Sequence, residues 1–99
     1  MEIIIGSYTN EESQVIDIVW DTEKQYDEQD EATKNKVVEL ASNNPVTVEE
    51  EEAGVYPRPT KQKVVCDGFE VHITIIYKHA ATSSLNGLID RYEYNIKEV

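Results

Sequence analysis

The clearest hydrophobic pattern in the chain is an alternation over residues 69–77. One face of an extended strand there carries only apolar or aromatic side chains, namely Phe69, Val71, Ile73, Ile75 and Tyr77. The intervening positions are polar except for Ile76, as is typical of a strand with one buried face. Asp67-Gly68 separates this run from a second β-rich run and favours a tight turn with positive φ angles. The pattern predicts a central antiparallel hairpin over 61–78, with Val64 opposite Val71.

Two further β-rich runs, residues 2–8 and 14–20, flank a polar segment near the N-terminus. Their alternation and their β-branched residues predict an N-terminal hairpin. A helix running from Glu11 to Val19 is the alternative, and the β-branched content disfavours it.

Residues 22–42 have the composition of a helix and contain neither glycine nor proline. Thr22 followed by Gln25 matches a capping box, and Asn43-Asn44-Pro45 should end the helix. One stripe at helical spacing combines four residues of the second half, Thr33, Val37, Leu40 and Ala41. We therefore expect the second half of the helix to pack on the sheet and the polar first half to be solvated.

The remaining segments are shorter. Residues 46–48 predict a strand that runs into four consecutive acids, Glu49-Glu50-Glu51-Glu52, and their mutual repulsion indicates an exposed edge. We expect a loop over 53–60, a helical turn near 83–89, and a final strand at about 90–97. Tyr92 fits both the helical and the strand spacing. The fold predicted for residues 1–99 is one α+β domain, with a mostly antiparallel sheet of five or six strands and one main helix (about 22–42) packed on one face.

Charge restricts the partners of this chain. Its 99 residues include 20 Asp and Glu against 9 Lys and Arg, a net charge of −11. Such a protein repels nucleic acid and anionic membranes, so we expect no direct nucleic-acid or membrane binding, and a basic protein surface as the partner. Cys66 is the single cysteine, which excludes an intramolecular disulfide and favours the cytoplasm, the host cell's if a phage encodes the chain. The N-terminus lacks the features of a signal peptide.

The acids cluster in the middle of the chain. Between Asp21 and Glu52 there are 11 acids and 3 bases, or −8 of the total charge. A helix would bring several of these carboxylates together at i, i+3 and i, i+4 spacing, where like charges destabilise it. A duplex carries one negative charge per about 1.7 Å of axis, which carboxylates on a helix and an adjoining strand could imitate. The candidate partner-binding residues are Glu23, Tyr26, Asp27, Glu28, Asp30, Glu31, Glu49, Glu50, Glu51, Glu52 and Tyr56. An ordinary solvated acidic face is the alternative.

In size and charge alone, the chain resembles small acidic α+β inhibitors encoded by mobile elements: DNA mimics, restriction inhibitors and anti-CRISPR proteins. This likeness implies an inhibitor that occupies a basic, nucleic-acid-binding site on a larger protein. No motif in the sequence supports a family assignment.

Metal binding and catalysis have weak signals. Cys66, His72 and His79 match no compact zinc motif. The hairpin register places Cys66 and His72 on opposite faces, which disfavours a nucleophile and base pair. The sequence also lacks a GxSxG, an HExxH and a phosphate-binding glycine loop. We therefore expect no enzyme activity and no cofactor.

Two functional hypotheses follow. The first is the acidic inhibitor, with Tyr26 or Tyr56 as an apolar contact. The second is a structural or assembly protein, such as a phage component, that pairs through sheet edges; a homodimer is compatible with this second hypothesis. The long strand 69–77 and the isoleucine-rich N-terminal run support the second.

Overall fold

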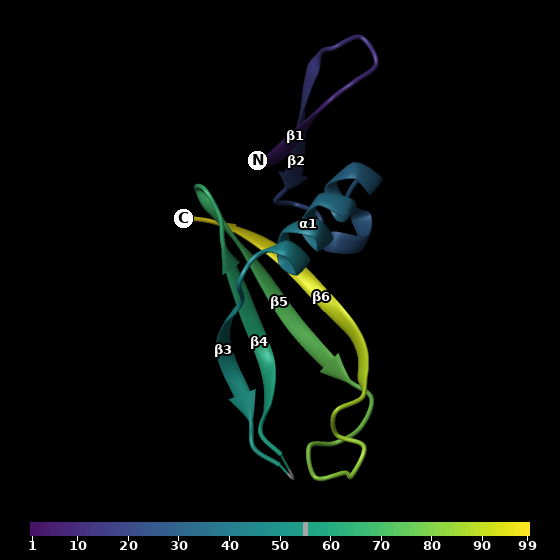
Figure 1. The fold of residues 1–99 in the computed structure, drawn as a ribbon, viewed down its shortest axis with the longest axis vertical. Coiled ribbons are helices and arrows are strands. Elements are labelled where there is room, and N and C mark those ends of the chain that lie inside the picture. The colour runs from purple at the N-terminus through teal and green to yellow at the C-terminus, as the bar shows by residue number, and fades with distance from the viewer. Residues whose placement is uncertain (55) are drawn as a thin grey trace.

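The computed structural model describes residues 1–54 and 56–99. These residues form six strands, one α-helix and one 3₁₀ helix. The strands and the α-helix are labelled in Figure 1. In chain order they are β1 (Glu2–Thr9), β2 (Val15–Asp21), η1 (Tyr26–Glu28), α1 (Glu31–Asn43), β3 (Thr47–Glu52), β4 (Arg58–Val65), β5 (Phe69–Tyr77) and β6 (Ile89–Glu98). The predicted α+β class is confirmed, and so is the predicted antiparallel pairing.

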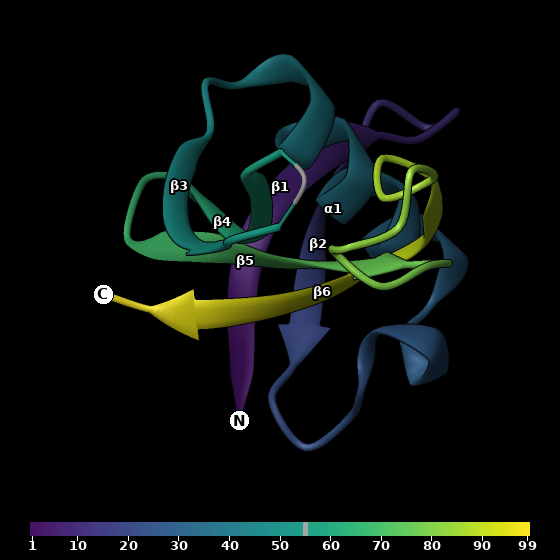
Figure 2. The ribbon, with the colours of Figure 1, turned by 90° about the horizontal axis from the view of Figure 1, so that it is seen from below.

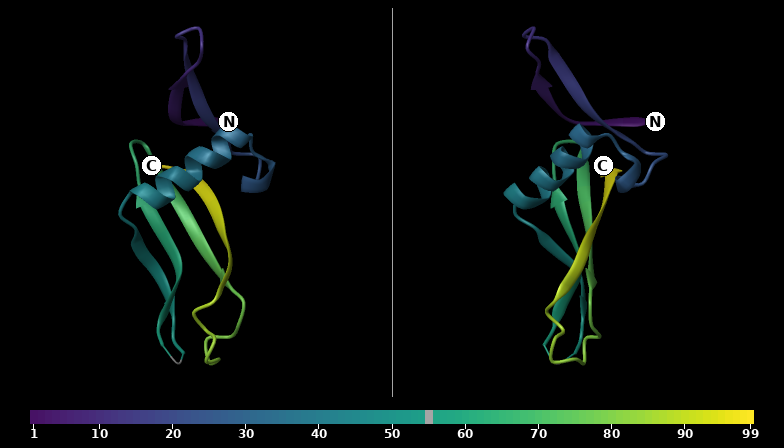
Figure 3. Two further views of the ribbon diagram at one scale, coloured as in Figure 1. Left: turned by 45° about the vertical axis from the view of Figure 1, so that its right-hand side comes forward. Right: turned by 90° about the vertical axis from the view of Figure 1, so that its right-hand side faces the viewer.

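The strands form two separate sheets. The hairpin β1-β2 is one, and the other has the order β3-β4-β5-β6. The hairpin stands at one end of the larger sheet, with α1 between them (Figure 3). Seen from below, β1 and β2 run across the direction of β5 and β6 rather than along it (Figure 2). The molecule is therefore elongated, with extents of 53 × 25 × 23 Å.

The central hairpin forms with the predicted register. Val64 pairs with Val71, and the Cys66 amide donates to the Phe69 carbonyl across the turn at 2.9 Å. Gly68 has a φ of +83°, whereas Asp67 has no positive φ, so glycine alone supplies the left-handed conformation of this turn. The inward face of β5 is buried from Phe69 to Ile75, as the alternation predicts.

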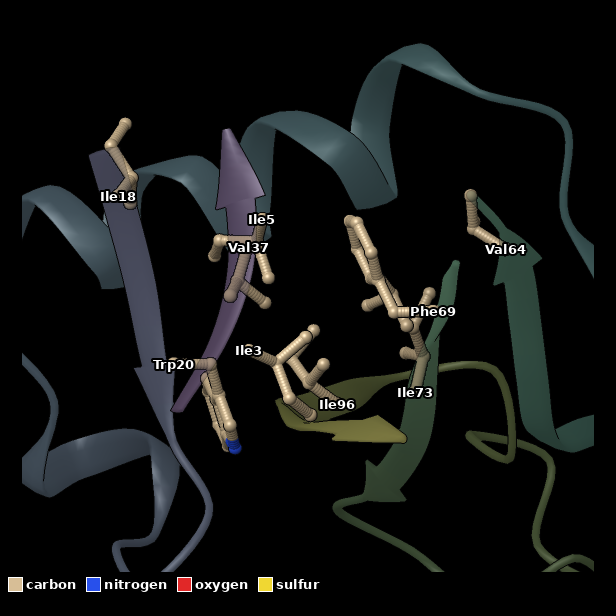
Figure 4. Packing of buried hydrophobic residues seen from close by; sticks show 10 residues of the cluster. Ile3, Ile5, Ile18, Trp20, Val37, Val64, Phe69, Ile73 and Ile96 are labelled. Carbon is tan, nitrogen blue, oxygen red and sulfur yellow. The ribbon is translucent and has the colours of Figure 1, made fainter. Parts of the chain in front are cut away.

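One apolar core joins both sheets to α1 (Figure 4). The hairpin contributes Ile3, Ile5, Ile18 and Trp20, and α1 contributes Val37. The larger sheet contributes five residues, Val64, Phe69, Val71, Ile73 and Ile96. Burial of such side chains stabilises the fold by roughly 1.5–3 kcal/mol each. The hairpin is thus held to the larger sheet by packing, without a strand pair between them in the described residues.

The predicted helix over 22–42 is too long at its N-terminal end. Residues 22–30 form turns and η1, and α1 begins only at Glu31. Gln29 is the reason, because its side chain is only 7% exposed and bonds to the backbone of Asp21 and Lys24. These tertiary bonds replace the helical ones, so the capping box predicted at Thr22 and Gln25 does not start α1. The acids of residues 23–31 consequently do not share one helix face.

Three other boundaries differ from the predictions. β3 includes the four acids, and β4 begins at Arg58, so the predicted loop 53–60 is shorter; Val55 within it lies outside the described residues. Pro59 is tolerated in β4 because the β3-β4 register is irregular beside it. Where a helical turn is predicted near 83–89, residues 80–88 form successive turns with i to i+3 hydrogen bonds, and β6 begins at Ile89.

Candidate protein-binding surface

The structure separates the predicted partner-binding residues into two acidic groups and Tyr56. Glu23 to Glu31 lie around η1 and the start of α1, beside the N-terminal hairpin, whereas the four acids of β3 lie along one edge of the larger sheet (Figure 1). Tyr56 lies at the far end of the molecule, in the β3-β4 connection, and is 72% exposed. The two acidic groups therefore do not form one continuous face.

The four acids of β3 are largely compensated by bases of β4. Glu49 lies 2.9 Å from Lys63, and Glu50 lies 3.7 Å from Lys61. The bond to Glu49 raises the pKa of Lys63 above its usual value. Because antiparallel pairing sets each base beside an acid, this run presents much less net charge than its sequence suggests.

Glu52 has a structural partner. Its carboxylate accepts two hydrogen bonds from Arg58, at 2.9 and 3.1 Å. Arg58 is 9% exposed, donates to the carbonyls of His79 and Asn86, and lies 4.0 Å over the Tyr77 ring. This network ties β3, β4 and the 79–88 segment together. Glu51 is the member of the acidic run that enters no salt bridge within the described residues.

Most of the acids near η1 lack a basic partner in the described structure, whereas most of those of β3 have one. The side chains of Glu23, Asp27, Glu28 and Asp30 are exposed, and no salt bridge within residues 1–54 and 56–99 involves any of them. Glu31 is the first residue of α1, and its carboxylate lies 3.8 Å from the Lys34 ammonium, one helical turn away. The position of Glu31 at the N-terminus also suits the helix dipole.

Tyr26 connects η1 to the larger sheet. Its ring centroid lies 5.1 Å from that of Tyr94, which lies 6.3 Å from that of Tyr92. Burial raises the pKa of Tyr26 above 10.0, and the nearby charges of Asp27 and Glu31 add to the effect. Burial also raises the pKa of Tyr94. Tyr26 thus anchors the acidic η1 segment to the core, leaving only part of its ring to a partner.

The N-terminal hairpin adds acids that the sequence reasoning missed. Residues 1–31 contain ten acids against one base, Lys24, so −9 of the −11 charge lies in the first third of the chain. The added acids are Glu2, Glu11, Glu12 and Asp17, all of which precede residue 21. Counting charge from the first residue, rather than between residues 21 and 52, would have identified them. One end of the elongated molecule is therefore strongly acidic, and acids and bases nearly balance over the rest.

The hairpin also exposes apolar side chains. Ile4, Tyr8 and Val15 are 59%, 48% and 70% exposed, respectively. The tip is built by Asn10, whose side-chain oxygen accepts bonds from the amides of Glu12 and Gln14. Ser13 has a φ of +63°, a turn conformation next to this tip. The acidic end thus exposes apolar side chains beside its carboxylates.

A shallow hollow of about 370 Å³ lies between η1 and β6. It combines Tyr26 and Asp27 with basic residues of the sheet, including Lys61, Arg91 and Lys97. Arg91 is paired with Asp90 and Glu93, so this hollow holds mixed charge.

Across the described part of the chain, no three His, Cys, Asp or Glu side chains are grouped to hold a metal ion. None of the described helices has the length and apolar character needed to cross a membrane.

Comparison of the chain with protein-family models, curated proteins and solved structures finds no match.

Proposed function

We propose that this protein is a small acidic inhibitor that binds a basic, nucleic-acid-binding site on a larger protein through its N-terminal end. The proposal rests on one observation, the concentration of ten acids and a single base in residues 1–31. These residues form the hairpin and the η1 segment at one end of the molecule. Inhibition would follow from steric and electrostatic occlusion of the site.

The distribution of the carboxylates over one end of the molecule supports a phosphate-like surface. They lie on a two-stranded hairpin and on the segment packed beside it, which together expose many separate negative charges. Holding like charges together at one end lowers the stability of the fold through repulsion. Solubility alone does not require such a cluster, because dispersed charges would provide it. A basic cleft built for phosphates would repay that cost and would attract the acidic end over several ångströms at low salt.

The second acidic group has a smaller role in this proposal. Glu49, Glu50 and Glu52 are paired with bases of β4, so we expect them to contribute little to association. Glu51 and Tyr56 are exposed, but they lie away from the hairpin end. We further propose that the protein acts in the cytoplasm as an anti-defence or DNA-mimic factor, since its single cysteine suits a reducing compartment.

The proposal is tested with two variants that lose equal charge. One carries Glu11→Gln, Glu12→Gln and Asp17→Asn; the other carries Glu49→Gln, Glu50→Gln and Glu51→Gln. Each is used to capture proteins from a bacterial lysate at low and high salt, with identification by mass spectrometry. The unsubstituted chain should capture a nucleic-acid-processing protein at low salt only, and duplex DNA should compete with it.

The hairpin variant should associate roughly tenfold more slowly with the captured protein than the β3 variant does. Equal effects of the two variants would contradict the hairpin end as the binding surface. Capture of a partner indifferent to salt and to DNA would contradict the inhibitor function itself.

Assembly through sheet edges is a second candidate function. The observation that favours it is the hairpin, whose strands β1 and β2 pair only with each other among the described residues. Sedimentation at increasing protein concentration separates the two candidates, because self-assembly gives a salt-insensitive oligomer and the inhibitor gives a monomer.

A further inference from the structure

Half of the β2 edge is already occupied by side chains of the same chain. The Gln29 side chain accepts from the Asp21 amide at 3.0 Å and donates to the Asp21 carbonyl at 2.8 Å. Two residues earlier, the Thr33 hydroxyl donates to the Val19 carbonyl at 2.7 Å. These groups stand where a third strand would otherwise place its backbone.

The other half of this edge faces outward without such partners. The Asn10 amide bonds to the Gln14 carbonyl, which marks the first hydrogen-bonded pair of the hairpin. Because such pairs alternate in an antiparallel ladder, Thr9 with Val15 and Ser7 with Asp17 are the pairs whose backbone groups point away from the partner strand. Val15 and Asp17 thus continue the outward row of Val19 and Asp21. Within the described chain, β2 pairs with β1 alone.

Charge distinguishes this edge from the edges of the larger sheet. β3 protects its edge with four glutamates, and β6 carries five charged residues of both signs, a common defence against strand addition. The free half of β2 has one charge, Asp17, beside the exposed Val15. Glu11 and Glu12 lie beyond it at the tip, and Asp30 and Glu31 adjoin Gln29 at the other end. A second copy would bring the same acids and be repelled, whereas a basic strand would be attracted.

We propose that the free half of the β2 edge binds an extended basic segment of the partner protein as an added β-strand. This inference rests on the proposed function and names its binding mode. Val15 and Asp17 together offer roughly four backbone groups for the new ladder. Bases alternating along the added strand would lie next to Asp17 and the flanking acids, and apolar residues would cover Val15.

The test uses a synthetic peptide of alternating lysine and valine, and the same peptide with alternate amides N-methylated. The methylated peptide keeps the charge and loses the ability to form a ladder. Binding to the full chain is followed at low salt by NMR, with amide hydrogen exchange as the readout. Val15→Pro removes one outward donor of β2, and Thr9→Pro is its matched control, because it lies in the same cross-strand pair on the opposite edge.

The expected result is binding of the unmethylated peptide, with exchange at Val15 and Asp17 slowed at least tenfold. Val15→Pro should weaken binding about tenfold, and Thr9→Pro should leave it unchanged. Protection in the unsubstituted chain answers the question even where a proline variant unfolds. Equal binding of both peptides without protection would overturn strand addition while leaving the acidic inhibitor intact. Protection at Ser7 and Thr9 would overturn the choice of edge, and no binding of either peptide would count against the proposed function as well.

Discussion

The side-chain amide of Gln29 bonds to both backbone polar groups of Asp21, as a residue of a neighbouring strand would. The side-chain nitrogen of Gln29, Nε2, also donates to the Lys24 carbonyl at 3.1 Å. One buried glutamine therefore fixes the conformation of residues 21–29 and occupies the backbone groups at the C-terminal end of the β2 edge. It also determines where α1 can begin. The acidic η1 segment owes its position beside the hairpin to this contact.

Replacing this glutamine should loosen the acidic end. Gln29→Ala removes three hydrogen bonds around partly buried backbone groups, and we expect the free energy of unfolding to fall by about 1–3 kcal/mol. Urea unfolding followed by Trp20 fluorescence measures the loss, because Trp20 is buried next to Asp21. The control is Gln62→Ala, a half-buried glutamine whose side chain forms no hydrogen bond in the described structure; it should change stability by less than about 0.5 kcal/mol. Equal effects would contradict the role given to Gln29.

Arg58 should dominate the stability of the opposite end. Arg58→Ala leaves Glu52 without its partner and two carbonyls without a donor, so we expect a loss of about 3 kcal/mol. Lys61→Ala is the matched control, because its pair with Glu50 is half exposed on both sides and should be worth less than about 1 kcal/mol. Thermal unfolding of the two variants should differ accordingly. A similar small shift for both would show that the Arg58 network contributes little.

The turn at Gly68 provides a local test. Gly68→Ala forces a side chain into a φ of +83°, which should cost about 1–2 kcal/mol although the site is open. Gly87→Ala is also open and has no positive φ, so its effect should stay within about 0.5 kcal/mol. Equilibrium unfolding in urea compares the two variants. If Gly87→Ala were the more destabilising one, the conformational explanation would be wrong.

Alkaline pH should destabilise the fold through its partly buried tyrosines. Burial raises the pKa of Tyr26 and Tyr94 in the folded state above the unfolded value of 10.0. The folded state then holds these protons more tightly, so their contribution is complete below pH 10.0 and is lost as pH rises through the raised values. Urea midpoints between about pH 8 and about pH 11 should fall, and Tyr26→Phe should make the decline shallower. An unchanged slope in Tyr26→Phe would exclude Tyr26 as a source of the effect.

The parts of the fold that depend on residues close together in the sequence could be predicted. The 61–78 hairpin follows from alternation and from one Asp-Gly turn, and its register is confirmed at Val64 and Val71. The start of α1 could not be predicted, because residues 22–30 have good helix composition and only the tertiary bonds of Gln29 override it. The separation of β1-β2 from the larger sheet depends likewise on packing, which no local pattern records.

The candidate surface was harder to predict than the fold. The run Glu49 to Glu52 is the strongest charge signal in the sequence, yet its basic partners lie on β4, later in the chain, and only strand pairing brings them beside it. The acids of the hairpin are dispersed along the chain and become a cluster only when β1 and β2 pair. Charge counted along the sequence therefore overestimates the exposed negative charge of the Glu49 to Glu52 run and underestimates that of the hairpin.

The elongated shape has a consequence for stoichiometry. Nearly all of the net charge lies at one end of a 53 Å axis, so the protein is an electric dipole that turns this end toward a positive surface before contact. Under the proposed function, a single such end would let each copy occupy one basic site rather than bridge two. An inhibitor built this way would titrate its target one to one and keep the inhibited complex dispersed, where a chain acidic at both ends would cross-link its targets.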